Sequence, residues 1–234
     1  MVDADKNGAD VKTPQSVLPV MLKTAGFGLL LFVAAGRLNW VAGWLFLAAN
    51  AITTAASYAY INRVNPGLMA KRARVGKGTK TWDKFWLVVF ILLSGAVYLV
   101  AALDAGRYGW SEMSFYLWPP GCVVFFFAAF ITAWSMGVNP FFEKTVRIQS
   151  ESDHRVIDAG PYRFARHPGY IGIIGVLVSV PLMLGSWWAL IPSALSVIAI
   201  IIRTAFEDRT LREELPGYVE YAARVRFRLF PMIW

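Results

Sequence analysis

The sequence is very poor in residues that hold metals or form disulfides. Its 234 residues include one cysteine, Cys122, and two histidines, His154 and His167. A single cysteine excludes a disulfide framework and a multi-cysteine zinc or iron–sulfur site, and two histidines exclude a histidine-rich metal centre. Because an apolar run surrounds Cys122, we expect it to pack as a small hydrophobic residue. We expect a function that requires no metal.

Charged residues are scarce as well. They make up 16% of the chain, against about 25% in a typical soluble domain. Hydrophobic residues make up 57%, and the mean hydropathy is +0.49. A soluble fold would have to bury more apolar side chains than its volume allows. Since lipid leaves the backbone groups of an open sheet edge unsatisfied, the composition predicts an all-α integral membrane protein.

The apolar residues come in long runs. A helix needs about 20 mostly apolar residues to cross the hydrocarbon core. Six segments meet or approach this length: 17–36, 38–61, 85–104, 115–138, 169–185 and 187–206. No water-soluble linker separates the last two, which predicts a tight helical hairpin. The chain then divides into a polar tail (1–16), a four-span bundle (17–138) and a core with the last two spans and a cytosolic tail (139–234).

Lysine and arginine concentrate in alternate connections. They gather in 63–84, 144–166 and 209–228, and the other connections carry almost none. Because basic residues favour the cytoplasmic side, this alternation predicts a multi-pass protein with both termini in the cytoplasm. The net charge of +8 is then explained by topology and by contact with anionic membrane lipid, and we expect no nucleic-acid partner. No small-residue cleavage site follows the first apolar run, so we expect no removable signal peptide.

Three glycines recur at every third position where the fifth span begins: Gly169, Gly172 and Gly175. Such spacing favours the close approach of a neighbouring helix. The alternative is that the glycines make room for the flat ring of a ligand.

The chemically capable side chains gather in residues 139–170 and 203–228. A connection of about 30 residues is long enough to suggest a function, although it could simply cap the bundle. Its most specific stretches are Gly160-Pro161-Tyr162 and Arg166-His167-Pro168-Gly169-Tyr170. Pro168 suits the first turn of the fifth span, whose free N–H groups can receive a carboxylate. His167 would then be a donor beside this helix start, or a cap.

The second segment begins where the last span ends. Arg203 and Glu207 are four residues apart and share a helix face. They could form an intrahelical ion pair worth a few tenths of a kcal/mol, or the guanidinium could hold an anionic acceptor beside a carboxylate that binds a polar cofactor. The residues that follow predict an amphipathic tail helix, and we expect Arg224, Arg226 and Arg228 to contact lipid headgroups.

Residues 149–231 resemble the isoprenylcysteine carboxyl methyltransferase family, which is itself similar to phospholipid methyltransferases. The resemblance rests on an ordered series of short motifs: the stretch from His154, Gly160-x-Tyr162, Arg166-His167-Pro168-x-Tyr170, an apolar hairpin, Arg203-x-x-x-Glu207 and Gly217-x-x-x-Tyr221. It implies a membrane-embedded methyltransferase that uses S-adenosyl-L-methionine and has no Rossmann domain. The family usually has two glutamates after the arginine, where this chain has Glu207 and Asp208.

The resemblance also implies roles for individual residues. It makes Arg203 and Glu207 catalytic, with Arg203 on the acceptor carboxylate. It places the cofactor against Gln149, His154, Arg155, Val156, Ile157, Tyr162, His167, Pro168, Gly169, Tyr170 and Glu207. The spacing from Gln149 to His154 is shorter than in the family.

The acceptor stays open at this point. The leading hypothesis is a lipophilic carboxylate or thiol, such as a prenylated compound, that enters between helices. A phospholipid amine is a second possibility; because an amine must lose a proton, Glu207 would then matter more as a base than Arg203 as a clamp. A non-catalytic membrane scaffold or transporter is a third.

Overall fold

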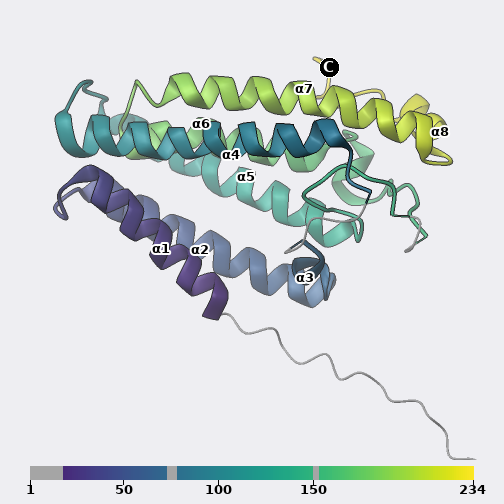
Figure 1. Ribbon diagram of the computed structural model, residues 1–234, viewed down its shortest axis with the longest axis horizontal. Helices are drawn as coiled ribbons and strands as arrows, with labels where there is room; N and C mark the ends of the chain where they lie inside the picture. Colours follow the sequence, from purple (N-terminus) through teal and green to yellow (C-terminus); the bar gives the residue numbers. More distant parts are fainter. Residues whose placement is uncertain (1–17, 73–77, 150–152) are drawn as a thin grey trace, which may run out of the picture.

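The computed structural model describes residues 18–72, 78–149 and 153–234 (Figure 1). The predicted polar tail, 1–16, lies outside the described residues. The described residues form eight α-helices and contain no strand, which confirms the all-α fold class. The helices are α1 (Leu18–Ala35), α2 (Val41–Val64), α3 (Leu68–Arg72), α4 (Thr81–Ala101), α5 (Trp118–Val138), α6 (Pro168–Leu184), α7 (Leu190–Glu214) and α8 (Tyr218–Arg224).

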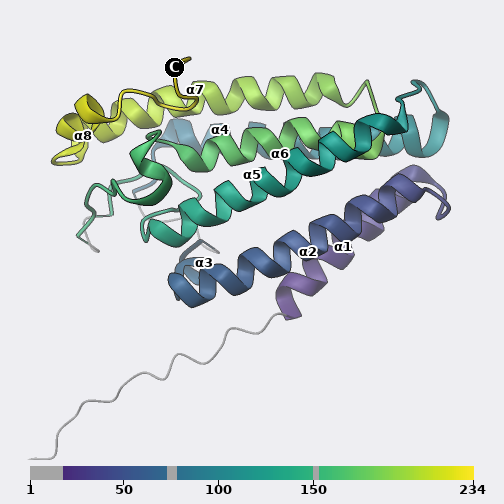
Figure 2. The same ribbon diagram turned by 180° about the vertical axis from the view of Figure 1, so that it is seen from behind.

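The long helices lie side by side along one common direction (Figures 1 and 2). The α1–α2, α4–α5 and α6–α7 connections lie at one end of the bundle. At the other end, α3 and α8 flank the irregular segment that joins α5 to α6. We call this second end the loop end. α5 packs along α6, α4 packs against α7, and α2 packs against α5.

All six predicted spans are helical, but their lengths differ. Four helical stretches are long and apolar enough to cross a membrane: Val41–Val64, Thr81–Tyr108, Phe115–Val138 and Leu190–Glu214. Thr24–Ala35 of α1 and Pro168–Leu184 of α6 are apolar but shorter. At 1.5 Å per residue, the 17 residues of α6 fall short of the hydrocarbon core, which is about 30 Å thick. Six crossings and two cytoplasmic termini therefore remain predictions.

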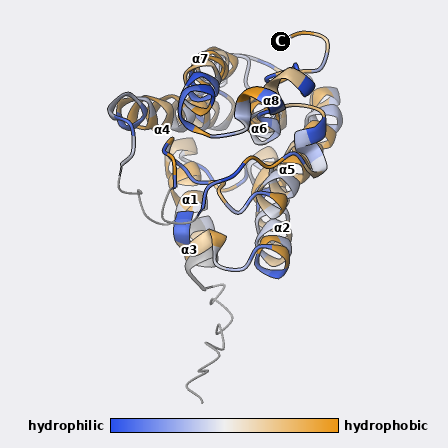
Figure 3. Cartoon of the chain, turned by 90° about the vertical axis from the view of Figure 1, so that its right-hand side faces the viewer, coloured by the Kyte–Doolittle hydropathy of each residue, from blue (hydrophilic) through white to orange (hydrophobic). Residues whose placement is uncertain are grey.

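The outer faces of the long helices are apolar. Large apolar side chains, whose contact with water is unfavourable, are exposed there: Leu30 is 71% exposed, Leu92 68% and Phe127 63%. Hydrophilic residues gather at the loop end, on α3, α8 and the irregular segment (Figure 3). This distribution is typical of a bundle whose sides face lipid.

The α5–α6 contact explains two of the three spaced glycines. A Cβ on Gly172 would lie 2.1 Å from Thr132 Oγ1 and 2.6 Å from the Ala128 carbonyl oxygen. A Cβ on Gly175 would lie 2.7 Å from Ala128 Cβ. Helix approach at these two glycines is therefore confirmed. Gly169 instead faces the Phe142 ring, 2.5 Å from a Cβ placed there.

The predicted hairpin between α6 and α7 is present. Gly185 ends α6 with a φ of 80°, a left-handed conformation that glycine adopts without steric penalty. Its N–H donates to the carbonyl of Pro181 at 2.9 Å. α7 then runs to Glu214, eight residues beyond the predicted end of the last span at 206, and the short α8 follows it.

Candidate functional site

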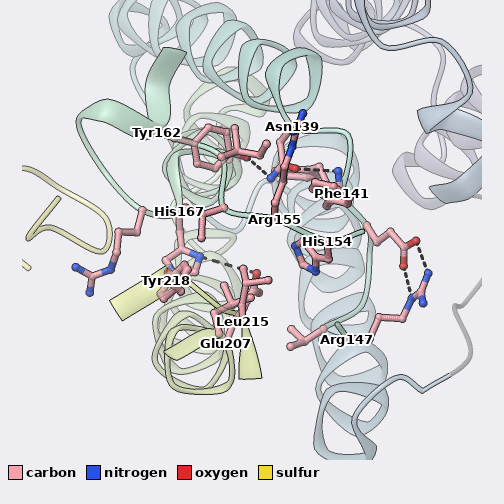
Figure 4. Close-up of a pocket in the computed structure, with 18 of the residues that line it drawn as sticks. Asn139, Phe141, Arg147, His154, Arg155, Tyr162, His167, Glu207, Leu215 and Tyr218 are labelled. Atoms are coloured by element: carbon pink, nitrogen blue, oxygen red, sulfur yellow. Dashed lines mark hydrogen bonds and ion pairs between the residues drawn. The ribbon is translucent and has the colours of Figure 1, made fainter. Parts of the chain in front are cut away.

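A cavity opens at the loop end, between the α5–α6 segment and the ends of α7 and α8. It encloses about 800 Å³ free of protein atoms, including its solvent-open mouth. Figure 4 shows Phe141 and His154 on one side of it and His167 and Tyr218 on the other. Ten predicted site residues line it: His154, Arg155, Val156, Ile157, Tyr162, His167, Gly169, Tyr170, Arg203 and Glu207.

Two predicted residues are outside the lining and support it. Gln149 is 2% exposed; its Nε2 donates to the Phe141 carbonyl at 2.9 Å, and its backbone N–H donates to His154 Nδ1 at 3.3 Å. Pro168 is the first residue of α6, as predicted. Gln149 therefore shapes the loop that carries His154, and Pro168 starts the helix that carries Gly169 and Tyr170.

Asn139 connects the end of α5 to the cavity wall. Its Oδ1 accepts from the Phe141 N–H at 2.8 Å, and its Nδ2 donates to the Tyr162 hydroxyl at 3.1 Å. The Phe141 ring lies against the His154 ring, with centroids 4.5 Å apart. The hydrogen bonds of Asn139 thus fix the backbone of Phe141, whose ring packs with the His154 ring beside the cavity (Figure 4).

Tyr162 lies in the turn Gly160–Arg163 and is 6% exposed. Gly160 opens this turn with a φ of 56°, as the glycine–proline pair predicts. The Tyr221 hydroxyl of α8 donates to the Tyr162 carbonyl at 2.7 Å. Burial raises the pKa of the Tyr162 phenol above its ordinary value, so this hydroxyl stays neutral.

His167, Tyr170 and Glu207 meet where α6 begins. The Tyr170 hydroxyl donates to Glu207 Oε2, and His167 Nδ1 lies 3.9 Å from Glu207 Oε1. The His167 and Tyr170 rings stack, with centroids 5.7 Å apart and 9° between planes. His167 is the N-cap residue but makes no side-chain capping bond. Glu207 keeps 21% of its side chain exposed, so its carboxylate is accessible from the cavity that it lines.

Asp208, the neighbour of Glu207, is fully buried; it shares His167 with Glu207, since His167 Nε2 lies 3.5 Å from Asp208 Oδ1, but its other partners are different. Its carboxylate accepts hydrogen bonds from Arg166 Nε at 2.7 Å, Arg212 Nε at 3.1 Å, Arg228 Nε at 2.9 Å and the Tyr218 hydroxyl at 3.0 Å. Arg228 is therefore bound to a carboxylate, which differs from the headgroup contact expected of it. Asp208 ties α7 to α8 and to the segment before α6, and Glu207 is left to face the cavity.

The backbone before α6 is also paired with the chain after α8. The N–H groups of Arg166 and His167 donate to the carbonyls of Phe227 and Arg228, each at 2.9 Å. This two-rung pairing fixes the position from which the His167 ring enters the cavity.

Arg203 pairs with a residue from the first half of the chain. Its Nε donates to Asp83 Oδ1 at 2.8 Å and its Nη2 to Asp83 Oδ2 at 3.3 Å. Its guanidinium carbon lies 4.3 Å from the Trp86 ring centroid. The ion pair that Arg203 makes is thus with Asp83 on α4, and not the intrahelical pair with Glu207 that the spacing allowed.

Comparison with known proteins shows what this segment is similar to. Residues 121–213, from α5 to the end of α7, match the profile of the isoprenylcysteine carboxyl methyltransferase (ICMT) family. The chain is also similar to the protein-S-isoprenylcysteine O-methyltransferase of Saccharomyces cerevisiae, with 30% identity over 91 residues. That match covers 36% of this chain and 36% of the yeast protein. The resemblance predicted for residues 149–231 is confirmed over the part that this match covers, 149–213, which includes Arg203 and Glu207.

Sequence reasoning missed Asn139, Phe141, Tyr218 and Asp83. Tyr218 lies one residue after Gly217, so the terminal glycine–tyrosine motif was a usable signal for it. Asn139 directly follows the last apolar residue of α5, a position where a polar side chain can reach an adjoining loop. Nothing local distinguishes Asp83, which is 120 residues from Arg203.

Proposed function

We propose that this protein is a membrane-embedded, S-adenosyl-L-methionine-dependent methyltransferase that acts on a lipophilic carboxylate or thiol. The observation that carries the proposal is the meeting of Tyr162, His167 and Glu207 around one cavity. These side chains come from a turn, a helix start and a second helix, and all three belong to the segment that matches the family. A cap on the bundle would not need an accessible carboxylate and paired rings to line a common cavity.

The side chains around the cavity fit this cofactor chemically. The ring pairs Phe141–His154 and His167–Tyr170 offer flat faces, which suit a purine base. The Glu207 carboxylate suits ribose hydroxyls or the positive charge of a sulfonium. We assign cofactor binding to these residues and to the stretch from His154 to Ile157. When bound, S-adenosylmethionine supplies a methyl group on a positively charged sulfur, which a carboxylate oxygen or thiolate can attack directly.

The residues then have to position the reactants. Holding two reactants in line can account for about 7–11 kcal/mol of barrier lowering. Arg203 is the residue that would hold an acceptor carboxylate, through charge-assisted hydrogen bonds. A carboxylate is already ionised at neutral pH, so its methylation needs no base. A thiol must lose a proton. Glu143 and Glu207 both line the cavity, and because Glu143 is paired with Arg147, Glu207 is the side chain that could accept the proton.

The test begins with cofactor binding. Purified protein in detergent is titrated calorimetrically with S-adenosylhomocysteine, and we expect saturable binding. Glu207→Gln should weaken it at least tenfold. Glu213→Gln is the matched control, because Glu213 lies on the same helix with its side chain 55% exposed and pairs with the surface residue Arg209. Absence of binding to the wild type would favour a non-catalytic scaffold.

The acceptor is tested next, with a radiolabelled methyl donor. The assay compares an N-acetylated S-farnesylcysteine, a long-chain thiol and phosphatidylethanolamine in the same detergent. We expect label to be transferred to the carboxylate or to the thiol. Transfer to phosphatidylethanolamine alone would replace this proposal with a phospholipid N-methyltransferase.

A further inference from the structure

Asp83 is a buried carboxylate outside the segment that matches the family. It lies in the first turn of α4, is fully buried, and precedes the matched residues 121–213. Both of its oxygens bind Arg203, at 2.8 and 3.3 Å. A two-point contact of this kind fixes the plane of a guanidinium as well as its distance.

The same carboxylate also binds the cavity wall. Its Oδ2 accepts from the backbone N–H of Val146 at 2.6 Å. Arg203 Nη2 donates to the Lys144 carbonyl at 2.8 Å, and the Lys80 N–H donates to the Val146 carbonyl at 3.2 Å. Asp83 and Arg203 therefore join α4 and α7 to the segment that follows α5, and both Val146 and Arg203 line the cavity.

These contacts use one edge of the guanidinium. Nε and Nη2 donate to Asp83 and to the Lys144 carbonyl, and Nη1 makes none of these bonds. The guanidinium carbon is 4.3 Å from the Trp86 ring centroid and 5.3 Å from that of Tyr170. Held at one edge and stacked against rings, the group has little freedom to rotate.

We infer that Asp83 is a positioning residue that presents Arg203 Nη1 to the anionic group of the methyl acceptor. This inference rests on the proposed function and adds a role for the first half of the chain. Because Asp83 neutralises the charge of Arg203, the pair has no net charge with which to attract an anion. It would bind an anion through hydrogen bonds from the N–H groups of Nη1. We therefore expect the acceptor to be an amphiphile that carries a carboxylate at one end of an apolar body. The carboxylate oxygen would accept a hydrogen bond from the fixed Nη1 of Arg203.

The test separates acceptor binding from cofactor binding. In Asp83→Asn, we expect the KM for an N-acetylated S-farnesylcysteine to rise at least tenfold, because an amide can accept from Arg203 at only one of its two atoms. The affinity for S-adenosylhomocysteine should stay within twofold of the wild type. Asp158→Asn is the matched control, because Asp158 forms an exposed ion pair with Arg224; its KM should not change.

Two further variants keep the inference falsifiable if Asp83→Asn does not fold. Asp83→Glu preserves the buried pair but displaces the guanidinium by one methylene, and its acceptor KM should also rise with cofactor affinity unchanged. In an Arg203→Met background, Asp83→Asn should add less than twofold to the KM, since Asp83 acts through Arg203.

Each outcome has a defined meaning. An unchanged or lower KM in both Asp83 variants of an active enzyme would overturn this inference alone. Equal loss of cofactor affinity and acceptor affinity would make Asp83 a structural residue, which also overturns it. A wild type that binds S-adenosylhomocysteine but methylates no carboxylate would overturn it as well, and a wild type that does not bind would overturn the proposed function first.

Discussion

The Tyr170 hydroxyl on α6 donates a hydrogen bond to the Glu207 carboxylate on α7, and both side chains line the same cavity. This contact joins the two helices of the hairpin at the end where the cofactor is proposed to bind. It also orients one carboxylate oxygen, while His167 lies nearest to the other.

Removing the Tyr170 hydroxyl should therefore weaken cofactor binding. A hydrogen bond to a charged group contributes about 1.5–3 kcal/mol, so Tyr170→Phe should lower the affinity for S-adenosylhomocysteine about tenfold or more. Calorimetric titration measures this. Tyr116→Phe, at a residue 89% exposed in the α4–α5 connection, is the control and should bind normally. Normal affinity in Tyr170→Phe would show that Glu207 does not need this bond.

Asp208 should control stability more than any neighbouring acid. Its removal leaves Arg166, which is 4% exposed, without a counter-charge. Breaking a buried pair in this way costs about 3–5 kcal/mol. Asp208→Asn should accordingly lower the unfolding temperature in detergent by many degrees. Arg212→Gln removes a partner that is 41% exposed and should cost under about 1 kcal/mol; equal effects would contradict a buried central carboxylate.

The α5–α6 contact should not tolerate a methyl group. Gly172→Ala would place its Cβ 2.1 Å from Thr132 Oγ1 and 2.6 Å from a backbone oxygen of Ala128. Overpacking of this kind costs about 1–3 kcal/mol, and thermal unfolding in detergent measures the loss. Gly95→Ala on α4, where nothing lies within 4 Å of the added Cβ, should be neutral or slightly stabilising. Equal stability of the two variants would mean that the helices can separate without cost.

Alkaline pH should destabilise the loop end. Burial raises the pKa values of Tyr162, Tyr218 and Tyr221 in the folded protein. A raised pKa contributes stability that is complete below the unfolded value, about 10, and is lost as pH rises toward the folded value. The unfolding temperature should therefore fall as the pH rises above about 10, the unfolded value. Tyrosinate absorbance should show these phenols ionising together with unfolding; their ionisation in the folded protein would contradict the burial.

The sequence predicted what is local and missed what is distant. The turn at Gly160, the start of α6 at Pro168 and the pairing of Gly172 with a neighbouring helix all follow from a few adjacent residues. The extension of α7 to Glu214 was missed because the prediction followed the apolar run, which ends near residue 206. The helix continues beyond it through polar residues that include the Arg209–Glu213 ion pair. The Asp83–Arg203 and Arg166–Asp208 pairs join segments 120 and 42 residues apart. Several charged residues lie close to each of these four along the chain, so the sequence offers no reason to choose one partner over another.

The backbone pairing of Arg166 and His167 with Phe227 and Arg228 means that the segment after α8 supports the wall of the cavity. Removing residues 227–234 would remove the two hydrogen bonds that hold the backbone of Arg166 and His167, although none of the removed residues lines the cavity. Such a chain would also lose the Arg228–Asp208 ion pair and the buried Leu229, so we expect it to be less stable as well as weaker in binding S-adenosylhomocysteine.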